Sequence, residues 1–457
     1  MALDMTQGKP LKLLTAFALP LILSSIFQQL YTLGDSVIVG RLLGEEAFAA
    51  IASSSYLDWF PLSMLLGLSQ GFGVVLAQRF GAKDEGGFRR ALAMSLLLAL
   101  ALAALLTVLG VCFQGPFLRA LRTPAPLYAY TADYLRVLWL GLAVTAVQNI
   151  YGTALRALGD SRTPLVSLVL STLLNIALDY LFMAPLGMGV QGAALATVLA
   201  RGASVAYCAW RLRRTAFATP SRADFRPHRP TIRALLRLGL PPMFSFAVTA
   251  TGELAVQATF NLQGVLFVTG VTAAKRYYSL LNVIGSSLEG ALATFVGQNT
   301  GARRMRRVMD GVRTATWLGA LTAVLTAGLA ILFRRQLILF FLPEASAELL
   351  RIGMDALFAE AILLVSLTML CLHRAALQGM GNALVPMLSG FMELALRYAC
   401  VLLLPLLFAR ESLYFIDAIT WTVTGAFVVI VYYATRRRLC AALEKQGEAT
   451  PKTLTAP

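Results

Sequence analysis

The sequence predicts an all-α polytopic membrane protein with twelve transmembrane helices in two pseudo-symmetric six-helix lobes. Of the 457 residues, 58% are hydrophobic and 14% are charged, and the mean hydropathy of +0.71 lies well outside the range of soluble domains. Apolar stretches of about 20 residues, the length of a membrane-spanning helix, recur from near residue 13 to near residue 435. The two halves of the chain also resemble each other, which predicts the two lobes.

The first span begins almost at the start of the sequence and has no small-residue cleavage site, so we expect no removal as a signal peptide. Basic residues then gather in alternate loops, at 9–12, 79–90, 156–162, 211–237, 303–307 and 436–438, while the opposite loops hold fewer. The positive-inside rule places the basic loops and both termini in the cytoplasm of a multi-pass cell-membrane protein. This placement accounts for the net charge of +16 without a nucleic-acid partner.

The chain has only two histidines and five scattered cysteines, with no C-x-x-C pair and no H-E-x-x-H motif. We therefore expect no disulfide, no zinc site and no cofactor. No buried nucleophile paired with a base is visible either, which argues against a membrane enzyme. We expect a monomeric protein whose partners are the lipid bilayer and small-molecule substrates.

The longest polar interruption lies at the middle of the chain and reads RLRRTAFATPSRADFRPHRPTIRALLRLG. We interpret residues 1–210 as a first lobe, 211–239 as a cytoplasmic linker, 240–438 as a second lobe and 439–457 as a cytoplasmic tail. Three pairs of segments support the division, each offset by about 220 residues: LLTAFALP with LLRLGLPP, VLAQRFGAK with FVGQNTGAR, and ALRALGDSRTP with ALQGMGNALVP. An even number of helices per repeat relates the lobes by an axis along the membrane normal, with the substrate path between them.

The third pair also predicts a local structure. Gly159 and Gly381 are each placed to end a helix in a left-handed conformation, and Asp160 and Asn382 are placed to cap the helix that follows.

The first span carries a polar stripe. Gln28, Tyr31 and Asp35 are spaced by three and four residues, which places them on one helix face. An Asp at the centre of a span costs about 2.5 to 3.5 kcal/mol on insertion scales, so such residues usually face a partner or a water-filled cavity. Pro20 lacks an amide donor and can bend the same helix.

The fifth span carries a second stripe, Ser171, Asn175 and Asp179, repeating every four residues. For Asn175 alone an interhelical hydrogen bond is the competing interpretation. Neighbouring spans add three polar residues on a similar face of span four and one on span six: Tyr134, Gln148 and Asn149, and Thr197. Carboxylates, an amide oxygen and a hydroxyl suit a hard cation, and two close carboxylates can instead share a proton. We therefore predict a Na⁺ or H⁺ coupling site.

The second half does not duplicate this set. At the repeat offset, Asp35 corresponds to Val256, Asn175 to Arg397 and Asp179 to Val401. Other acids are predicted to lie in the membrane there, namely Glu253 on span seven, Glu289 on span eight and Glu393 on span eleven. Glu393 and Arg397 are spaced to form an ion pair on one helix face, and Lys275 or Arg276 is a candidate to approach Glu253.

At these residues the sequence resembles the prokaryotic multidrug and toxic compound extrusion (MATE) family. The resemblance is carried from about residue 13 to about residue 438 by LPLILSSIFQQLYTLGDSVIVGRLLG, ALRALGDSRTP, LLNIALDYLF with MGVQGAALATVLA, and ALQGMGN. It implies a V-shaped pair of lobes that exports organic compounds against an inward flow of Na⁺ or H⁺.

The resemblance also implies roles for single residues. It assigns the coupling site to Asp35, Asn175, Asp179 and Thr197, a helix bend to Pro20, and the substrate pocket to Gln28, Tyr31, Tyr134 and Asn149, beside which Gln148 is a further candidate. A second-lobe site on helices seven and ten is matched by Glu253, but LLVSLTMLCLHRAALQG, taken as helix ten, has no acid. We therefore expect the coupling site in the first lobe.

Two other transporter classes compete with this interpretation. A flippase for lipid-linked oligosaccharide would share the architecture but line its cleft with basic residues for a pyrophosphate group. The first-lobe candidates are acidic and aromatic and favour cationic or amphipathic drugs, although Arg201 and Arg397 leave the alternative open. A major-facilitator carrier is disfavoured because GAKDEGGFRR departs from the G-x-x-x-D-R-x-G-R-R signature.

Overall fold

The computed structural model describes residues 3–120 and 123–445, and all regular structure within these ranges is helical. The α-helices are α1 (Pro10–Gly81), α2 (Glu85–Ala120), α3 (Ala125–Leu140), α4 (Leu142–Ala157), α5 (Arg162–Met183), α6 (Gly189–Arg213), α7 (Arg229–Asn261), α8 (Val265–Gly301), α9 (Met305–Leu332), α10 (Arg334–Phe341), α11 (Ala347–Ile362), α12 (Leu364–Gly379), α13 (Leu384–Leu407) and α14 (Ile416–Lys445). Three short 3₁₀ helices, η1 (Ala216–Ala218), η2 (Arg222–Phe225) and η3 (Arg410–Phe415), lie in connections.

The described residues form 11 helices or helix segments long and apolar enough to span a membrane, or 12 if the bent pair α3 and α4 counts as one span. α1 supplies two spans, Pro10–Thr32 and Leu57–Gly81, and between them Gly44 leaves the helical conformation with φ 85°. α11 and α12 together form one span, Ala347–Gly379. The expected all-α membrane fold is confirmed.

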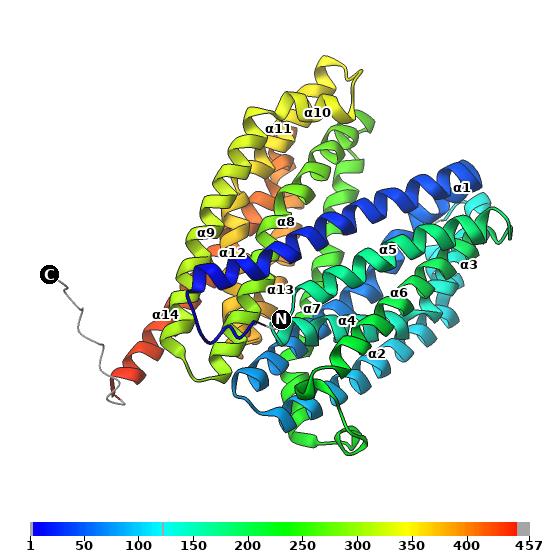
Figure 1. Ribbon diagram of the computed structural model, residues 1–457. Coiled ribbons are helices and arrows are strands. Elements are labelled where there is room, and N and C mark those ends of the chain that lie inside the picture. Colours follow the sequence, from blue (N-terminus) through cyan, green and yellow to red (C-terminus); the bar gives the residue numbers. More distant parts are fainter. Residues whose placement is uncertain (1–2, 121–122, 446–457) are drawn as a thin grey trace.

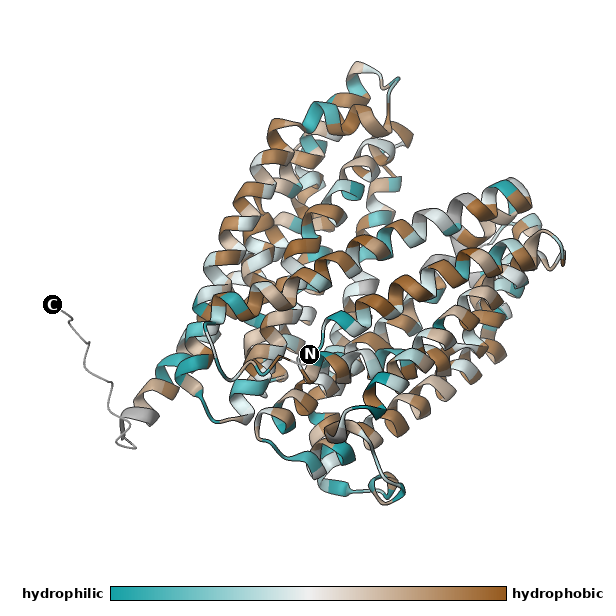
Figure 2. Ribbon diagram, in the orientation of Figure 1, coloured by the Kyte–Doolittle hydropathy of each residue, from teal (hydrophilic) through white to brown (hydrophobic). Residues whose placement is uncertain are grey.

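The helices form two bundles that converge near the N-terminus and diverge at the opposite end (Figure 1). Most of α1 and all of α2 to α6 build one bundle, and most of α7 and all of α8 to α14 build the other. Hydrophobic residues cover the helix surfaces along the bundles, and hydrophilic residues gather at the helix ends and loops (Figure 2). This distribution is the one that a bilayer around the bundles requires.

The two bundles exchange the starts of their first helices. Leu14 and Phe17 near the start of α1 are fully buried in the core of the second bundle, beside Leu288. Reciprocally, Leu235 and Leu238 near the start of α7 lie in the core of the first bundle. Each first helix therefore crosses from one lobe to the other, so the lobes stay joined along both helices.

Each crossing helix contains proline after its exchanged part, at Pro20 in α1 and at Pro241 and Pro242 in α7. α1 continues through Pro20 without leaving the helical conformation. Because a helix-internal proline removes a backbone hydrogen bond, each of these positions weakens the crossing helix that contains it. The bend predicted at Pro20 stays a prediction.

The turns predicted after the fourth and tenth spans are confirmed. Gly159 and Gly381 have φ of 84° and 90°, in the left-handed region that favours glycine. Asp160 Oδ1 accepts from the backbone N–H of Thr163 at 2.9 Å, and Asn382 Oδ1 accepts from that of Val385 at 3.3 Å. Both side chains thus satisfy amide groups at the start of the next helix.

Asp84 caps α2, and its removal gives a testable stability change. Its Oδ1 accepts from the Gly87 N–H at 2.8 Å, and its Oδ2 accepts from Arg79 at 2.7 Å. The Gly87 N–H first, and Arg79 in addition, hold the pKa of the Asp84 carboxyl below its ordinary value. We expect Asp84→Ala to lower the free energy of unfolding by about 1 kcal/mol at neutral pH.

The sign of the pH dependence follows from that lowered pKa. The carboxylate contributes its stability at pH values above the ordinary Asp pKa of about 3.9, and the contribution is lost as the pH falls through the lower folded-state value. Thermal unfolding in detergent should therefore show the parent and Asp84→Ala converging only in strong acid. Asp84→Asn keeps an acceptor for the Gly87 N–H, so a loss equal to that of Asp84→Ala would contradict the capping role.

Candidate functional site

The predicted coupling residues come together inside the first lobe. Tyr31 on α1 lies 3.3 Å from Thr197 on α6, hydroxyl to hydroxyl, and the Asn175 amide on α5 donates to the same Thr197 hydroxyl at 3.5 Å. The carboxyl groups of Asp35 and Asp179 adjoin each other across α1 and α5. The four-residue spacing of Asn175 and Asp179 places both on the face of α5 that is buried against α1 and α6.

The oxygens of this cluster lack conventional partners. Asp179 is 0% exposed and Asn175 is 1% exposed. Within the described residues, no donor reaches either carboxylate oxygen of Asp179, Asp35 Oδ1 or Asn175 Oδ1. An isolated buried carboxylate is strongly disfavoured unless a proton or a cation neutralises it. The donor set fits both, because two adjacent carboxyl groups can share a proton and an all-oxygen shell suits a hard cation.

A fixed positive charge borders the cluster and was missed as part of it. Arg201 lies one helical turn after Thr197 on α6 and interacts electrostatically with Asp35, Tyr31 and Asp58. Its guanidinium donates to the Thr145 hydroxyl on α4 at 2.9 Å, which orients it. The four-residue spacing of Thr197 and Arg201 was the available signal in the sequence.

The predicted substrate-pocket residues have varied surroundings. Tyr134 packs on the small core of Val39, Met183 and Ala193, close to Asp35. The Gln148 amide donates to Ser204 at 3.2 Å, and the Asn149 amide nitrogen is buried without a partner among the described residues.

A large cavity of about 1040 Å³ lies between the lobes. Its described lining comes from α1 and α4 of the first lobe and from α7, α8, α11, α12, α13 and α14 of the second. The lining includes two predicted acids, Glu253 and Glu289. It does not include Gln28, Tyr31, Tyr134, Gln148 or Asn149, so the substrate role of these five stays a prediction.

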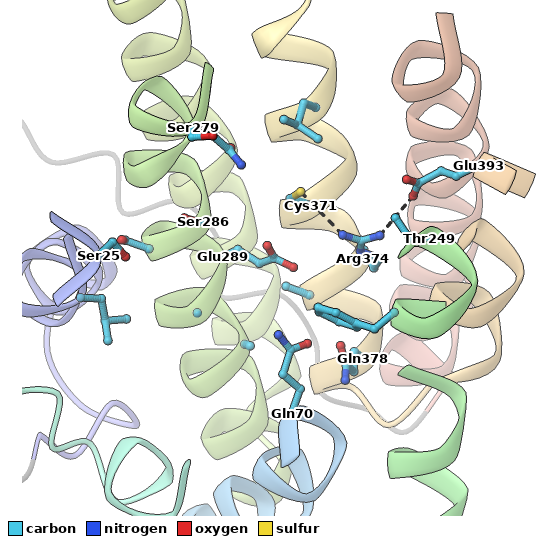
Figure 3. Close-up of a pocket in the computed structure, with 18 of the residues that line it drawn as sticks. Ser25, Gln70, Thr249, Ser279, Ser286, Glu289, Cys371, Arg374, Gln378 and Glu393 are labelled. Carbon is cyan, nitrogen blue, oxygen red and sulfur yellow. Dashed lines mark hydrogen bonds and ion pairs between the residues drawn. The ribbon is translucent and has the colours of Figure 1, made fainter. Parts of the chain in front are cut away.

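Arg374 organises one part of the cavity wall. Its guanidinium lies 3.2 Å from a Glu393 carboxylate oxygen and 3.8 Å from the Cys371 sulfur, and Glu289 adjoins Cys371 and Arg374 (Figure 3). The predicted same-helix pair of Glu393 with Arg397 is therefore wrong. Arg397 Nε instead donates to Asp417 Oδ1 on α14 at 3.0 Å, because partners on other helices lie closer.

A second group of charges lies around Asp417. The Lys275 ammonium lies 3.6 Å from Asp417, and Lys275 and Arg397 both interact electrostatically with Glu253. Glu360 joins this group and carries a buried carboxylate oxygen without a partner among the described residues. The expectation that helix ten has no acid is wrong, because the span Ala347–Gly379 starts well before the segment that was taken for it.

Among the described residues, no group of three or more His, Cys, Asp or Glu side chains is placed to hold a metal ion. The first-lobe cluster contributes only two such side chains, Asp35 and Asp179, and completes its oxygen set with Asn175 and Thr197.

Known sequences match this chain over most of its length. The MatE family model matches residues 20–181 and 241–402, at the spacing of the internal repeat. The probable multidrug resistance protein YoeA of Bacillus subtilis is 30% identical over 346 residues, which cover 72% of this chain and 73% of the relative. The probable multidrug resistance protein NorM of Thermotoga maritima is 26% identical over 391 residues, covering 84% and 83%.

Solved structures share the fold. A crystal structure of MATE in the bent conformation superposes with a TM-score of 0.87 at 24% identity, covering 97% of this chain and 98% of the other. The outward-facing conformation of a multidrug resistance MATE family transporter superposes with a TM-score of 0.85 at 24% identity, covering 96% and 98%. Since the family model matches most of the chain in two copies, this protein belongs to the MatE family, the multidrug and toxic compound extrusion transporters, which are not enzymes.

Proposed function

We propose that this protein is a monomeric antiporter of the cell membrane, with both termini in the cytoplasm, that exports organic cationic or amphipathic compounds. The inward flow of Na⁺ or H⁺ drives export by alternating access of the cavity to the two sides. The names of YoeA and NorM, both probable multidrug resistance proteins, support the substrate class.

The adjoining carboxyl groups of Asp35 and Asp179 carry the coupling proposal. The pair has two conditions: when it is occupied, a proton or cation neutralises it, and when it is empty, it carries a costly buried charge that attracts a proton or cation. Asn175 and Thr197 offer further oxygens, and Arg201 fixes a positive charge beside the pair. Occupation of the pair therefore changes the charge at the α1–α5 contact, which is the change that transport must convert into movement.

The cavity wall supports an organic cation as the substrate. It carries five carboxylates, Glu253, Glu289, Glu360, Glu393 and Asp417, and four basic groups, Arg156, Lys275, Arg374 and Arg397. Aromatic side chains accompany them, namely Trp59, Phe60, Phe246, Tyr278 and Trp421. Aromatic faces and carboxyl groups both attract cations.

Reconstitution in liposomes tests this proposal. The purified protein is reconstituted with the fluorescent organic cation ethidium as probe, and a Na⁺ gradient or a pH gradient is imposed separately. We expect one of the two gradients to drive ethidium movement above the rate of protein-free liposomes. Ethidium movement that ignores both gradients would overturn the coupling proposal, and the comparison identifies the coupling ion.

The basic groups of the cavity favour one alternative, a lipid-linked oligosaccharide flippase. Arg374 and Arg397, however, are committed to Glu393 and Asp417 at 3.2 and 3.0 Å. A pyrophosphate group would have to displace these carboxylates. Transbilayer movement of a fluorescent pyrophosphate-linked lipid in the same liposomes, without ethidium transport, would favour the flippase.

A further inference from the structure

Two glutamines bridge the lobes at the end of the molecule near the N-terminus. The Gln78 amide of α1 donates to the carbonyl oxygen of Gly379, the last residue of α12, at 3.0 Å. The Gln298 amide of α8 donates to the carbonyl oxygen of Ala157, the last residue of α4, at 2.9 Å. Each bond joins one lobe to the other.

The two bonds are counterparts in the internal repeat. Gln78 and Gln298 occupy the same position in VLAQRFGAK and FVGQNTGAR, and Ala157 and Gly379 occupy the same position in ALRALG and ALQGMG. Donor and acceptor thus exchange lobes between the two bonds, as a two-fold axis between the repeats requires. Two such matched bonds indicate that both repeats contribute equivalently to a specific contact between the lobes.

The backbones beside the two glutamines also touch. A Cβ atom on Gly81 would collide with the backbone oxygen of Gln298, and one on Gly301 would collide with that of Gln78. These two glycines are again repeat counterparts, one helical turn after each glutamine. Only glycine permits this approach, which brings the ends of α1 and α8 into direct contact.

One bond of the pair is reinforced by the N-terminal segment Leu3–Thr6. The backbone N–H of Leu3 donates to Gly159 of the first lobe at 3.1 Å, and that of Met5 donates to the Gln298 side-chain oxygen at 2.9 Å. The Met5 carbonyl accepts from Asn299 and Arg307 of the second lobe at 3.1 and 3.2 Å. Met5 and Gln298 are both 0% exposed, so the segment is built into the contact.

The contact borders the cavity between the lobes. Ala157, Ala293 and Gln378 line the cavity and lie beside or within the bridging segments, and the Ala157 carbonyl is itself an acceptor of the contact. The cavity can open at this end only if both glutamine bonds break and Leu3–Thr6 leaves its place between the lobes.

We infer that Gln78 and Gln298 form a reciprocal latch, reinforced by Leu3–Thr6, that holds the cavity closed on the side of the N-terminus. The inference rests on the alternating access of the proposed function, whose topology places this end in the cytoplasm. Because both bonds join the same two bodies, they act together, and loss of either weakens the closed state. Hydrogen bonds of this kind, one buried and one part-buried, shift such an equilibrium by about threefold to tenfold each.

Distances between spin labels test the latch. Cysteines replace the exposed repeat counterparts Arg90 on α2 and Asp310 on α9, in a background without the five native cysteines that retains transport. Pulsed electron–electron double resonance in detergent then measures the distance between the two labels, which reports the separation of the lobes at this end. We expect one short-distance population in the parent and a second, longer one in Gln78→Leu/Gln298→Leu. Met5→Ala keeps the backbone bonds but removes a side chain buried in the second-lobe core, so its longer-distance population should be smaller than that of the double variant.

Gln114→Leu is the matched control, because the buried Gln114 amide also donates to a backbone carbonyl, that of Ala132 at 2.6 Å, within the first lobe. It should leave the distances unchanged. If the double variant does not fold, Gln78→Asn, one methylene too short to reach Gly379, replaces it. Parent-like distances in a folded variant would overturn the latch alone, whereas widened distances with no gradient-driven ethidium transport in the parent would overturn the antiporter proposal alone.

Discussion

Asp179→Asn is expected to reduce gradient-driven ethidium transport to the rate of protein-free liposomes while the protein stays folded. Asp179 is 0% exposed and adjoins Asp35, so its carboxyl group is stable only when it is protonated or when a cation compensates for its charge. An amide has the same shape but cannot exchange a proton and holds no charge for a cation. The pair then no longer alternates between an occupied and an empty state, so the ion gradient cannot drive transport.

Folding should survive this substitution. Replacing one of two adjacent buried carboxyl groups removes a repulsion, so we expect an unchanged or higher melting temperature in detergent. Asp310→Asn, at an exposed carboxylate of α9, is the control and should transport like the parent. Full gradient-driven transport by Asp179→Asn would contradict the assignment of the coupling site to the first lobe.

The acids of this site could be found in the sequence because their cost does not depend on tertiary structure. A carboxylate inside an apolar span is expensive wherever the helix packs, and a four-residue spacing fixes its helix face. Spacing also identified Asn175 beside Asp179. It did not identify Arg201 as part of the site, because an arginine near a helix face gains its role only from the neighbours that α1 and α4 provide.

The second lobe shows where sequence reasoning fails. Glu360 was missed because a 17-residue apolar run looked complete, whereas the span begins earlier and is interrupted at Leu363 between α11 and α12. Glu393 and Arg397 have the spacing of a helical ion pair, but each finds a partner on another helix. The helical spacing alone contributes only about 0.3 to 0.5 kcal/mol even in exposed pairs, so tertiary contacts readily override it at these two buried residues.

The latch of Gln78 and Gln298 could be predicted from the sequence only in part. Its two glutamines belong to segments that the repeat already identified as equivalent, and the turns at Gly159 and Gly381 were predicted correctly. The carbonyl groups they reach depend on the distance between the lobes, which no local pattern encodes. The sequence therefore predicts that the two glutamines are equivalent in the repeat, but it does not predict that they contact the opposite lobe.

Arg397→Leu is expected to lower the free energy of unfolding by about 3 to 5 kcal/mol. Arg397 is 3% exposed, and its guanidinium donates to Asp417 at 3.0 Å. Without it, Lys275 at 3.6 Å alone faces Asp417, and the buried Glu360 loses one of the two positive charges that act on it. Thermal unfolding in detergent measures the change.

The matched control is Arg351→Leu, which breaks an exposed pair with Glu411 at 3.5 Å and should cost at most about 1 kcal/mol. Arg397→Leu/Asp417→Leu removes both partners and should recover most of the lost stability, because replacing a buried pair by apolar residues is often neutral. If Arg397→Leu is no more destabilising than Arg351→Leu, the buried pair does not stabilise this lobe.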